Sequence, residues 1–469
     1  MNVIPCVTWV KRGVAAACPE KVELATDELE TIIKETQSAL EDEDSDEDAT
    51  TSDTKKTEKF SEAGTDEYNF QNYDDESGNM HFAISSLATF SGTSGDPFIT
   101  NDDEDSEKED DIIKPSDNLV LVGHVENDAS ILEVFVYNER EGSFYCHHDI
   151  LLPSFPLCIE WLNYDRPNIK PGNLCAIGNM TPIIEVWDLD LIDCLEPAYK
   201  LGRKPNKKKK QKRIGHRDAV LDVAWNENYG HVLASGSVDE TVLLWDLENC
   251  KPVTKFDSFN EKVQALKWHP EKPHQLLTGC ADKFVRLFDC KVETPVQNWE
   301  ASGEVERVLW NISHPNHCII STDNGYIECF DERNDKPLWQ IKAHEKEITG
   351  LAQVCRNLLV SCSSDGVMKI WDILCKYPTL EWEQTNKLGA IQCLAVNPDN
   401  EFIFAAGGDN KAHNLEVIDI REIPSVRQKF VDELSLQSSF AMEIKQEVTN
   451  VTKDIEDMEI DGLSSSESD

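Results

Sequence analysis

Residues 215–246 read GHRDAVLDVAWNENYGHVLASGSVDETVLLWD, and residues 343–372 read AHEKEITGLAQVCRNLLVSCSSDGVMKIWD. In both stretches, short runs rich in Val, Leu and Ile are separated by Gly, Asn and Asp, which is the pattern of short β-strands joined by turns. Both stretches carry a His near their start and end on a Trp-Asp pair. We therefore interpret them as two copies of one β-unit.

The end of the third strand of this unit recurs along residues 119–421. It is marked by an apolar residue before Asp or Asn, at Tyr137, Trp187, Trp245, Phe288, Phe330, Trp371 and Ile418. From Trp245 onward the steps are 43, 42, 41 and 47 residues. The 58-residue step before Trp245 falls to 47 when the basic run at 203–213 is counted as an insertion between two units. These markers predict seven units.

The end of the first strand is an independent marker with the same period. It is occupied by Trp161, Trp225, Trp268 and Trp310, and later by Gln353 and Val396. A repeat of about 40–45 residues with four strands is typical of the blades of a WD40 β-propeller. Because each blade buries its faces only against its neighbours, a closed ring is expected. The sequence predicts an all-β fold, a seven-bladed WD40 β-propeller over residues 113–421, with the tryptophans in its core.

Two units carry the same four polar and aromatic residues. They are His216, Ser235, Asp239 and Trp245 in the third unit, and His344, Ser361, Asp365 and Trp371 in the sixth. Ser, His and Asp could also suggest a hydrolase, but the set occurs twice, includes a Trp and has the spacing of a hydrogen-bond network that fixes a turn between strands. We therefore interpret both sets as structural tetrads. Units four and five lack the His, so we expect their loops to be held mostly by packing.

The start of the chain fits the same scheme. Ile4, Val7 and Trp9 match a first-strand pattern, so residues 1–18 are predicted to contribute a strand to the propeller. Spacing leaves open whether this strand belongs to the first blade or closes the ring as the outer strand of the seventh. For residues 19–40 we predict a short helix, because Asp27 can cap it and apolar residues follow at helical spacing.

Negative charge is concentrated at the two ends of the chain, whose formal net charge is −43. Residues 1–112 contain 30 acidic and 8 basic residues, and residues 421–469 contain 12 and 5. Such blocks repel themselves and bury too little apolar surface to offset chain entropy. We predict a disordered acidic insert at 41–112 and an acidic, mostly disordered tail at 422–469. Ser45, Ser106 and Ser466 lie there in the acidic S-x-x-D/E pattern favoured by casein kinase 2 and are candidate phosphorylation sites.

One segment, RKPNKKKKQKR at 203–213, has the opposite charge. Its bases are Arg203, Lys204, Lys207, Lys208, Lys209, Lys210, Lys212 and Arg213. The run favours a nuclear-localisation signal or a contact with a nucleic-acid backbone, and a solvated loop is the alternative. Without interleaved aromatic residues it offers no stacking platform, so any RNA or DNA contact should be weak, non-specific and salt-dependent.

Composition and motifs exclude several classes of function. The chain is too acidic to coat DNA, and its apolar runs are too short to span a membrane. Its fifteen cysteines include no C-x-x-C pair, which favours reduced thiols. We find no metalloprotease, P-loop or nucleophile-elbow motif, and His147 and His148 should point to opposite faces of a strand. We therefore expect no catalytic residue, metal, cofactor or small-molecule substrate.

Several stretches resemble the periodic tryptophan protein 1 family of WD-repeat proteins. They are CVTWVKRGVA at 6–15, PEKVEL at 19–24, IKPSDNL at 113–119, FYCHHDILL at 144–152, AIGNMTPIIEVWDLD at 176–190 and KIWDIL at 369–374, and the lysine run also sits where the family has one. The resemblance implies a nuclear and nucleolar protein, associated with chromatin, that acts in ribosome biogenesis through ribosomal RNA transcription and processing and large-subunit assembly. It also implies protein partners such as histone H4 and ribosomal or ribosome-assembly proteins.

Our main hypothesis is a non-catalytic scaffold of the nucleolus that binds proteins through its propeller. Its acidic segments would speed encounter with basic partners. The alternative is a reader of the histone H4 tail that regulates transcription through the propeller face, which requires acidic and aromatic residues grouped around one pocket. A substrate adaptor of a ubiquitin ligase is a third possibility, for which we identify no motif.

Overall fold

The structure is a computed structural model that describes residues 2–22, 112–127, 129–164, 172–206, 211–292, 294–355 and 357–428. All of these residues belong to one compact unit. Residues 23–40 of the helix predicted at 19–40, residues 41–111 of the predicted acidic insert and the three candidate phosphorylation sites lie outside the described residues.

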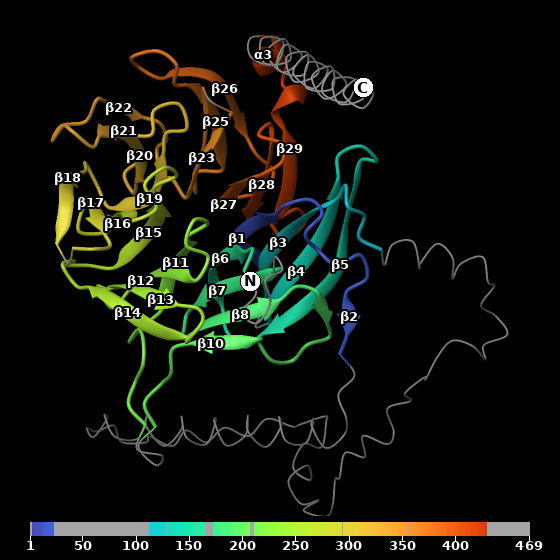
Figure 1. Cartoon of the computed structure of the whole chain (residues 1–469). Helices are drawn as coiled ribbons and strands as arrows, with labels where there is room; N and C mark the ends of the chain where they lie inside the picture. Colours follow the sequence, from blue (N-terminus) through green and yellow to red (C-terminus); the bar gives the residue numbers. More distant parts are fainter. Residues whose placement is uncertain are drawn as a thin grey trace, which may run out of the picture. The chain divides into compact units, whose positions relative to one another are not determined.

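The described strands form seven consecutive antiparallel blades arranged in a ring (Figure 1). From the centre outward, blade 1 contains β1 (Asn2–Val10), β3 (Asn118–Glu126), β4 (Ala129–Asn138) and β5 (Ser143–Leu152). Blade 2 contains β6 (Pro156–Leu162), β7 (Leu174–Asn179), β8 (Ile184–Asp188) and β10 (Tyr199–Leu201). Blade 3 contains β11 (Val220–Trp225), β12 (Val232–Ser237), β13 (Val242–Asp246) and β14 (Lys251–Phe256).

The remaining blades follow in the same order. Blade 4 contains β15 (Val263–Trp268), β16 (Gln275–Cys280), β17 (Phe284–Asp289) and β18 (Pro295–Glu300). Blade 5 contains β19 (Val305–Trp310), β20 (His317–Thr322), β21 (Tyr326–Asp331) and β22 (Trp339–Lys342). Blade 6 contains β23 (Gly350–Val354), β24 (Leu358–Cys362), β25 (Val367–Asp372) and β26 (Thr379–Thr385), and blade 7 contains β27 (Ile391–Val396), β28 (Ile403–Gly408) and β29 (Leu415–Asp419).

The innermost strands form a closed circuit. Each contacts the innermost strand of the next blade from β1 through β27, and β27 contacts β1 again. The predicted fold class, a seven-bladed WD40-type propeller, is confirmed. The recurring pairs at Tyr137, Trp187, Trp245, Phe288, Phe330, Trp371 and Ile418 all lie at the ends of third strands.

Apolar side chains fill the seams between blades. At the seam between blades 3 and 4, Phe256 of the outer strand β14 lies 4.6 Å between ring centroids from Phe288 of β17. Trp299 of β18 contacts Phe330 of β21 in the same way at 5.8 Å, across the next seam. The outer strand of one blade thus covers the aromatic end of the third strand in the next, and this burial supplies the driving force for stacking.

Tryptophans of the first strands tie adjacent blades through main-chain carbonyls. The indole nitrogen of Trp268 donates to the oxygen of Ala224 at 2.9 Å, and that of Trp310 donates to Lys267 at 3.4 Å. Trp9 makes the equivalent bond to Ala395 of β27 at 3.0 Å. The N-terminal strand is therefore the innermost strand of blade 1, and the alternative that made it the outer strand of blade 7 is wrong.

Polar groups join blades 7 and 1 at both ends of their seam. At one end, Asn414 donates to the side-chain oxygen of Asn2 at 2.6 Å, and the ring of His124 lies 2.9 Å from that oxygen and 2.9 Å from Glu133. At the other end, Arg12 and Arg421 both donate to Glu139, at 3.2 and 2.6 Å. These bonds hold the N-terminal strand in place from both sides.

Two domain boundaries need correction. Residues 19–22 do not begin a helix, because β2 (Glu20–Lys21) pairs in parallel with β9 (Leu191–Ile192) of blade 2. The propeller also extends past residue 421 through the short helices η3 (Ile420–Glu422) and α3 (Pro424–Val426), because Ile423 and Val426 are buried against the core.

All fifteen cysteines are free thiols, and nine of them are buried. Cys6, Cys158 and Cys393 occupy the same place on the first strands of blades 1, 2 and 7, each opposite a glycine of the second strand. A Cβ atom added at Gly123 would lie only 2.6 Å from the sulfur of Cys6, so glycine makes room for the thiol. Burial raises the pKa of all three thiols, which stay protonated.

Candidate functional site

The tetrad of blade 3 forms a continuous hydrogen-bond network. His216 contacts the hydroxyl of Ser235 at 2.7 Å through Nε2 and the carboxylate of Asp239 at 3.1 Å through Nδ1. Trp245 donates to the same hydroxyl at 2.7 Å, and Thr241 donates to Asp239 at 2.6 Å. These bonds depress the pKa of Asp239 despite its partial burial. The network links the loop before the first strand to the turn between the second and third strands, which is a structural role.

The tetrad of blade 6 has the same arrangement, but its aspartate lies farther from its histidine. His344 contacts Ser361 at 2.8 Å, and Trp371 donates to that hydroxyl at 2.9 Å. Nδ1 of His344 lies 3.4 Å from Asp365. Burial is the main cause that lowers the pKa of His344 to about 4, so this ring is neutral at physiological pH.

Blade 4 holds the corresponding turn with an ion pair, whereas we expected its loops to be held mostly by packing. Arg286 donates twice to Asp282, at 3.0 and 2.6 Å, and both side chains are 6% exposed. The guanidinium also lies over the rings of Phe259 and Phe284, at 5.1 and 5.3 Å. Phe259 stands one repeat of 43 residues after His216 and therefore occupies the histidine position in blade 4. The contact to the aspartate comes instead from Arg286 of the third strand.

Blade 5 also uses polar groups. The buried carboxylate of Glu328 accepts hydrogen bonds from the backbone of Ser302 at 3.1 Å and from Gln340 at 2.9 Å. Thr322 donates to Asn324 at 2.6 Å in the adjacent turn. The loops of blades 4 and 5 are therefore fixed by polar networks of different composition.

The basic run between β10 and β11 forms a β-hairpin. Arg203 and Ile214 exchange two main-chain hydrogen bonds at 2.8 and 3.0 Å, and Asn206 and Gln211 exchange two more at 3.0 and 2.9 Å. Arg213 folds back to donate to the main-chain oxygens of His216 and Arg217. Figure 1 shows this hairpin projecting from the ring in green. Lys207, Lys208, Lys209 and Lys210 lie outside the described residues.

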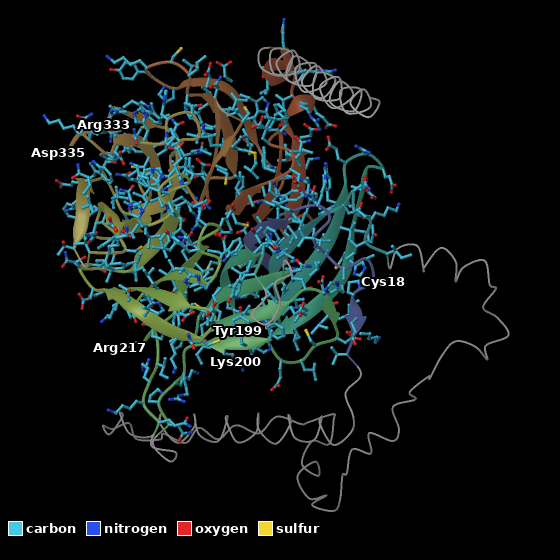
Figure 2. The ribbon with its side chains drawn as sticks, in the orientation of Figure 1. Cys18, Tyr199, Lys200, Arg217, Arg333 and Asp335 are labelled. Carbon is cyan, nitrogen blue, oxygen red and sulfur yellow. The ribbon has the colours of Figure 1, made fainter. Side chains whose placement is uncertain are left out.

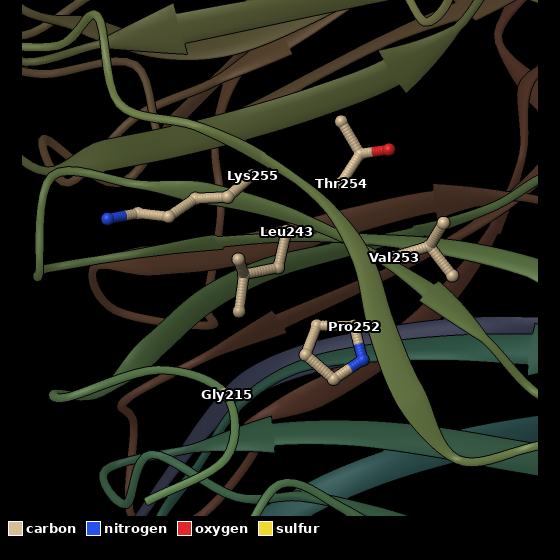
Figure 3. A pocket seen from close by; sticks show the side chains of 6 residues that line it. All are labelled: Gly215, Leu243, Pro252, Val253, Thr254 and Lys255. Atoms are coloured by element: carbon tan, nitrogen blue, oxygen red, sulfur yellow. The ribbon is translucent and has the colours of Figure 1, made fainter.

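The foot of this basic hairpin adjoins further basic residues and a small pocket. Lys200 and Arg217, both exposed, flank the hairpin in the sequence and lie at the edge of the ring from which it starts (Figure 2). Beside them is a shallow pocket of about 240 Å³, lined by Gly215, Leu243, Pro252, Val253, Thr254 and Lys255 (Figure 3). Val253 is the extra residue of a β-bulge in β14 and is 72% exposed. The site therefore presents positive charge next to a small apolar surface.

Two acidic residues on first strands were missed by the sequence analysis. Asp222 accepts a hydrogen bond from the backbone of Leu266 in the next blade at 2.6 Å, and Glu160 accepts one from Trp225 at 3.3 Å. Desolvation, as the largest cause, raises the pKa of Asp222 to about 6 and that of Glu160 to about 7. An acid inside an otherwise apolar strand was the available signal. Each of these carboxylates thus links its own blade to the main chain of the next blade.

The prediction that His147 and His148 of β5 point to opposite faces of the strand is wrong. A β-bulge in β5 makes His147 an extra residue, so His147 and His148 do not alternate. Their Nδ1 atoms lie 2.9 Å apart. Burial and the neighbouring ring lower the pKa of His148 to about 4.

Among the described residues no helix is long and apolar enough to cross a membrane.

Comparison with known proteins identifies the repeat and the family. The WD domain, G-beta repeat family matches residues 207–246, 250–289 and 335–372, which correspond to blades 3, 4 and 6. The periodic tryptophan protein 1 homolog of Drosophila melanogaster is 42% identical over 453 residues, covering 92% of this chain and 96% of that protein. The chain belongs to the periodic tryptophan protein 1 family.

Other relatives agree with this assignment. Periodic tryptophan protein 1 of Saccharomyces cerevisiae is 30% identical, over 95% of this chain and 93% of its own length. An uncharacterized WD repeat-containing protein of Schizosaccharomyces pombe is 36% identical, over 92% and 91%. Among solved structures, a chain of the Mitotic Checkpoint Complex matches with a TM-score of 0.50 and 17% identity, over 64% of this chain and 84% of that chain, which shows a shared fold alone.

Proposed function

We propose that this member of the periodic tryptophan protein 1 family is a non-catalytic scaffold that acts in ribosome biogenesis in the nucleolus and associates with chromatin. Family membership over almost the whole chain carries this proposal. A propeller of rigid blades with loops at both ends suits a platform for several proteins, and its structural tetrads serve to hold those loops in place.

The basic hairpin at 203–213 supports the proposal that the protein contacts nucleic acid. Its two pairs of main-chain bonds hold Arg203 and Lys204 opposite Lys212 and Arg213, away from the acidic body of the protein. Such a hairpin can neutralise phosphates and direct nuclear import without reading bases. We therefore assign to it weak, salt-dependent contact with an RNA or DNA backbone, alone or together with import.

The experiment is replacement of the endogenous protein by a tagged chain. Depletion should slow the maturation of large-subunit ribosomal RNA, measured by pulse labelling, and the tagged chain should restore it and collect in nucleoli. A chain with Lys207, Lys208, Lys209 and Lys210 changed to Ala should lose nuclear import or RNA contact. A matched variant with four exposed lysines of other blades changed to Ala (Lys291, Lys336, Lys376 and Lys387) should retain both. Normal ribosomal RNA maturation after depletion would refute the proposal.

A histone H4 tail reader is the second candidate, and one observation favours it. Exposed acidic residues lie in the loops on the face that carries the tetrad histidines, at Glu240, Asp257, Glu261, Glu345 and Glu347. Glu347 is close enough to Glu306 of β19 to add to the rise in its pKa, after the larger effect of burial. The nearby aromatic residues Phe259 and Phe284 are stacked on Arg286. Binding of an H4 peptide that is lost in a Glu345→Lys and Glu347→Lys variant would favour this candidate, and binding that persists would exclude this face.

A further inference from the structure

Blade 7 has three strands where each of the other six blades has four. In the described part of the chain, no strand pairs with the outer edge of β29. After Asp419 the chain turns through η3 and α3 toward β26 of blade 6, where Val426 is buried. The position of a fourth strand in blade 7 is therefore not taken by the described residues.

The outer edge of β29 presents main-chain groups that no described strand pairs with. Gly408 donates to the oxygen of Asn414 at 2.8 Å, and Ile420 donates to the oxygen of Phe402 at 3.0 Å, which fixes the even-numbered residues as those bonded to β28. Because main-chain groups alternate in direction along a strand, those of Leu415 and Val417 point outward. Such an edge is a template for an added strand.

The side chains around this edge are also incompletely covered. All five residues of β29 are only part-buried, whereas four of the six residues of β17, the equivalent strand of blade 4, are buried. On the facing side of blade 1, Phe144 is 38% exposed and Leu151 is 64% exposed. Phe144 stacks on Phe135 with 5.0 Å between ring centroids. At other seams an outer strand covers this region, as Phe256 does for Phe288.

Charge indicates what kind of segment fits. Glu133 of β4 is the register partner of Asp149 of β5, and both lie among the exposed apolar residues of this face. The two long segments of the chain outside the described residues, 23–111 and 429–469, lie within the acidic ranges 1–112 and 421–469, with 30 acids to 8 bases and 12 to 5. An acidic segment would meet like charge here, whereas a basic one would be attracted.

We propose that the outer edge of β29, with the exposed face of β4 and β5, binds an extended basic segment of a partner protein as the fourth strand of blade 7. The main chain of the segment bonds to Leu415 and Val417, which is β-augmentation. Alternate apolar side chains cover Phe135, Phe144 and Leu151. Its lysines or arginines pair with Asp149, because Glu133 already contacts His124. The proposal rests on the proposed function in one respect, because nucleolar partners of a scaffold are commonly basic.

The test places the photo-crosslinker p-benzoylphenylalanine at Phe144 of the full-length chain in cells. We expect a crosslink to one Lys/Arg-rich segment of another protein, located by peptide mass spectrometry. Its yield should be at least about tenfold higher than from the same crosslinker at Val253, which is more exposed but lies on a complete blade. Val417→Pro removes one outward N–H and should lower the yield about tenfold, and Asp149→Lys, an exposed change that leaves folding intact, should lower it about fivefold.

Several results would overturn the proposal. They are crosslinks to residues 23–111 or 429–469 of the same chain, to a second copy, or to nucleic acid, and equal yields from Phe144 and Val253. A yield unchanged by Asp149→Lys would do so as well, whether or not Val417→Pro folds. Ribosomal RNA maturation is measured separately in cells depleted of the protein without replacement, so normal maturation there together with a positive crosslink refutes the proposed function and leaves this inference standing.

Discussion

The seam between blades 3 and 4 and the seam between blades 7 and 1 join equivalent strands by different chemistry. At the first, Phe256 from an outer strand covers Phe288, and the buried pair Asp282–Arg286 fixes the turn. At the second, no described outer strand is present and His124 and Asn414 contact Asn2. Both seams share the contact between innermost strands. The comparison indicates that the inner circuit closes the ring, while the outer part of a seam can be left incomplete.

The largest expected effect tests the inner circuit at both kinds of seam. Trp9→Ala and Trp310→Ala each remove a mostly buried indole that bonds to the preceding blade, so each should cost about 3–5 kcal/mol of unfolding free energy. Urea unfolding followed by circular dichroism measures both. A cost below about 1 kcal/mol for Trp9→Ala alone would mean that the N-terminal strand does not close the ring.

The second prediction concerns the turn that blades 3 and 4 hold differently. Arg286→Leu leaves the buried carboxylate of Asp282 without its ion-pair partner and bonded to the backbone N–H groups of Asn260 and Phe284, so the variant should lose about 3 kcal/mol of stability. Adding Phe259→His should restore at least half of that loss, because it copies the histidine–aspartate contact and the leucine of blade 3 into blade 4. Thermal and urea unfolding of the single and double variants decide this, and a double variant no better than the single would show that the two turns are not interchangeable.

The third prediction compares the third strands of the two blades directly. Leu287 of β17 pairs with Gln297 of β18, whereas Val417 holds the same place in β29 with no described strand outside it. Leu287→Pro should therefore cost about 3 kcal/mol or more. In the isolated protein, Val417→Pro should cost less than about 1 kcal/mol, because proline is tolerated at a strand edge. Equal costs would show that the edge of β29 is already paired.

The smallest expected effect is a pH dependence confined to the seam between blades 7 and 1. The hydrogen bond to Glu133, the largest cause, raises the pKa of His124 above its ordinary 6.5. The stabilisation is fully present below the unfolded pKa and is lost as the pH rises through the folded pKa. The stability difference between wild type and His124→Gln should therefore be largest below the ordinary pKa of 6.5 and shrink as the pH rises from there through the raised folded pKa. The difference for Arg286→Leu should stay constant over that range, and a His124 difference that grows would reverse the assigned sign.

Much of this architecture was readable from the sequence because its signals are periodic. Two markers with one period gave the seven blades, and repeated spacings gave the tetrads of His216 and His344. The exact partners of single residues were not readable, since they depend on register. The replacement of a histidine by Arg286 involves another strand, and the contact of His147 with His148 follows from a bulge that breaks simple alternation.

Blade 7 shows the same limit at the level of a whole element. The sequence marker at Ile418 identifies the third strand of a blade. It therefore predicts a seventh blade but does not show whether a fourth strand follows. The placement of β1 in blade 1 was one of two alternatives, because Trp9 fits the first-strand pattern while spacing alone gives no pairing partner. Only the contacts of Trp9 with Ala395 and the pairing of β1 with β3 decide it.

Hydrogen exchange of individual amides tests the central claim most directly, in the isolated full-length protein. If β1 closes the ring and blade 7 ends at β29, the amides of β1 that bond to β3 should exchange as slowly as those of β11, and the amide of Leu287 should be equally slow. The amides of Leu415 and Val417 should exchange many times faster. Exchange of β1 at the rate of an unfolded chain, or of Val417 as slowly as Leu287, would contradict the account.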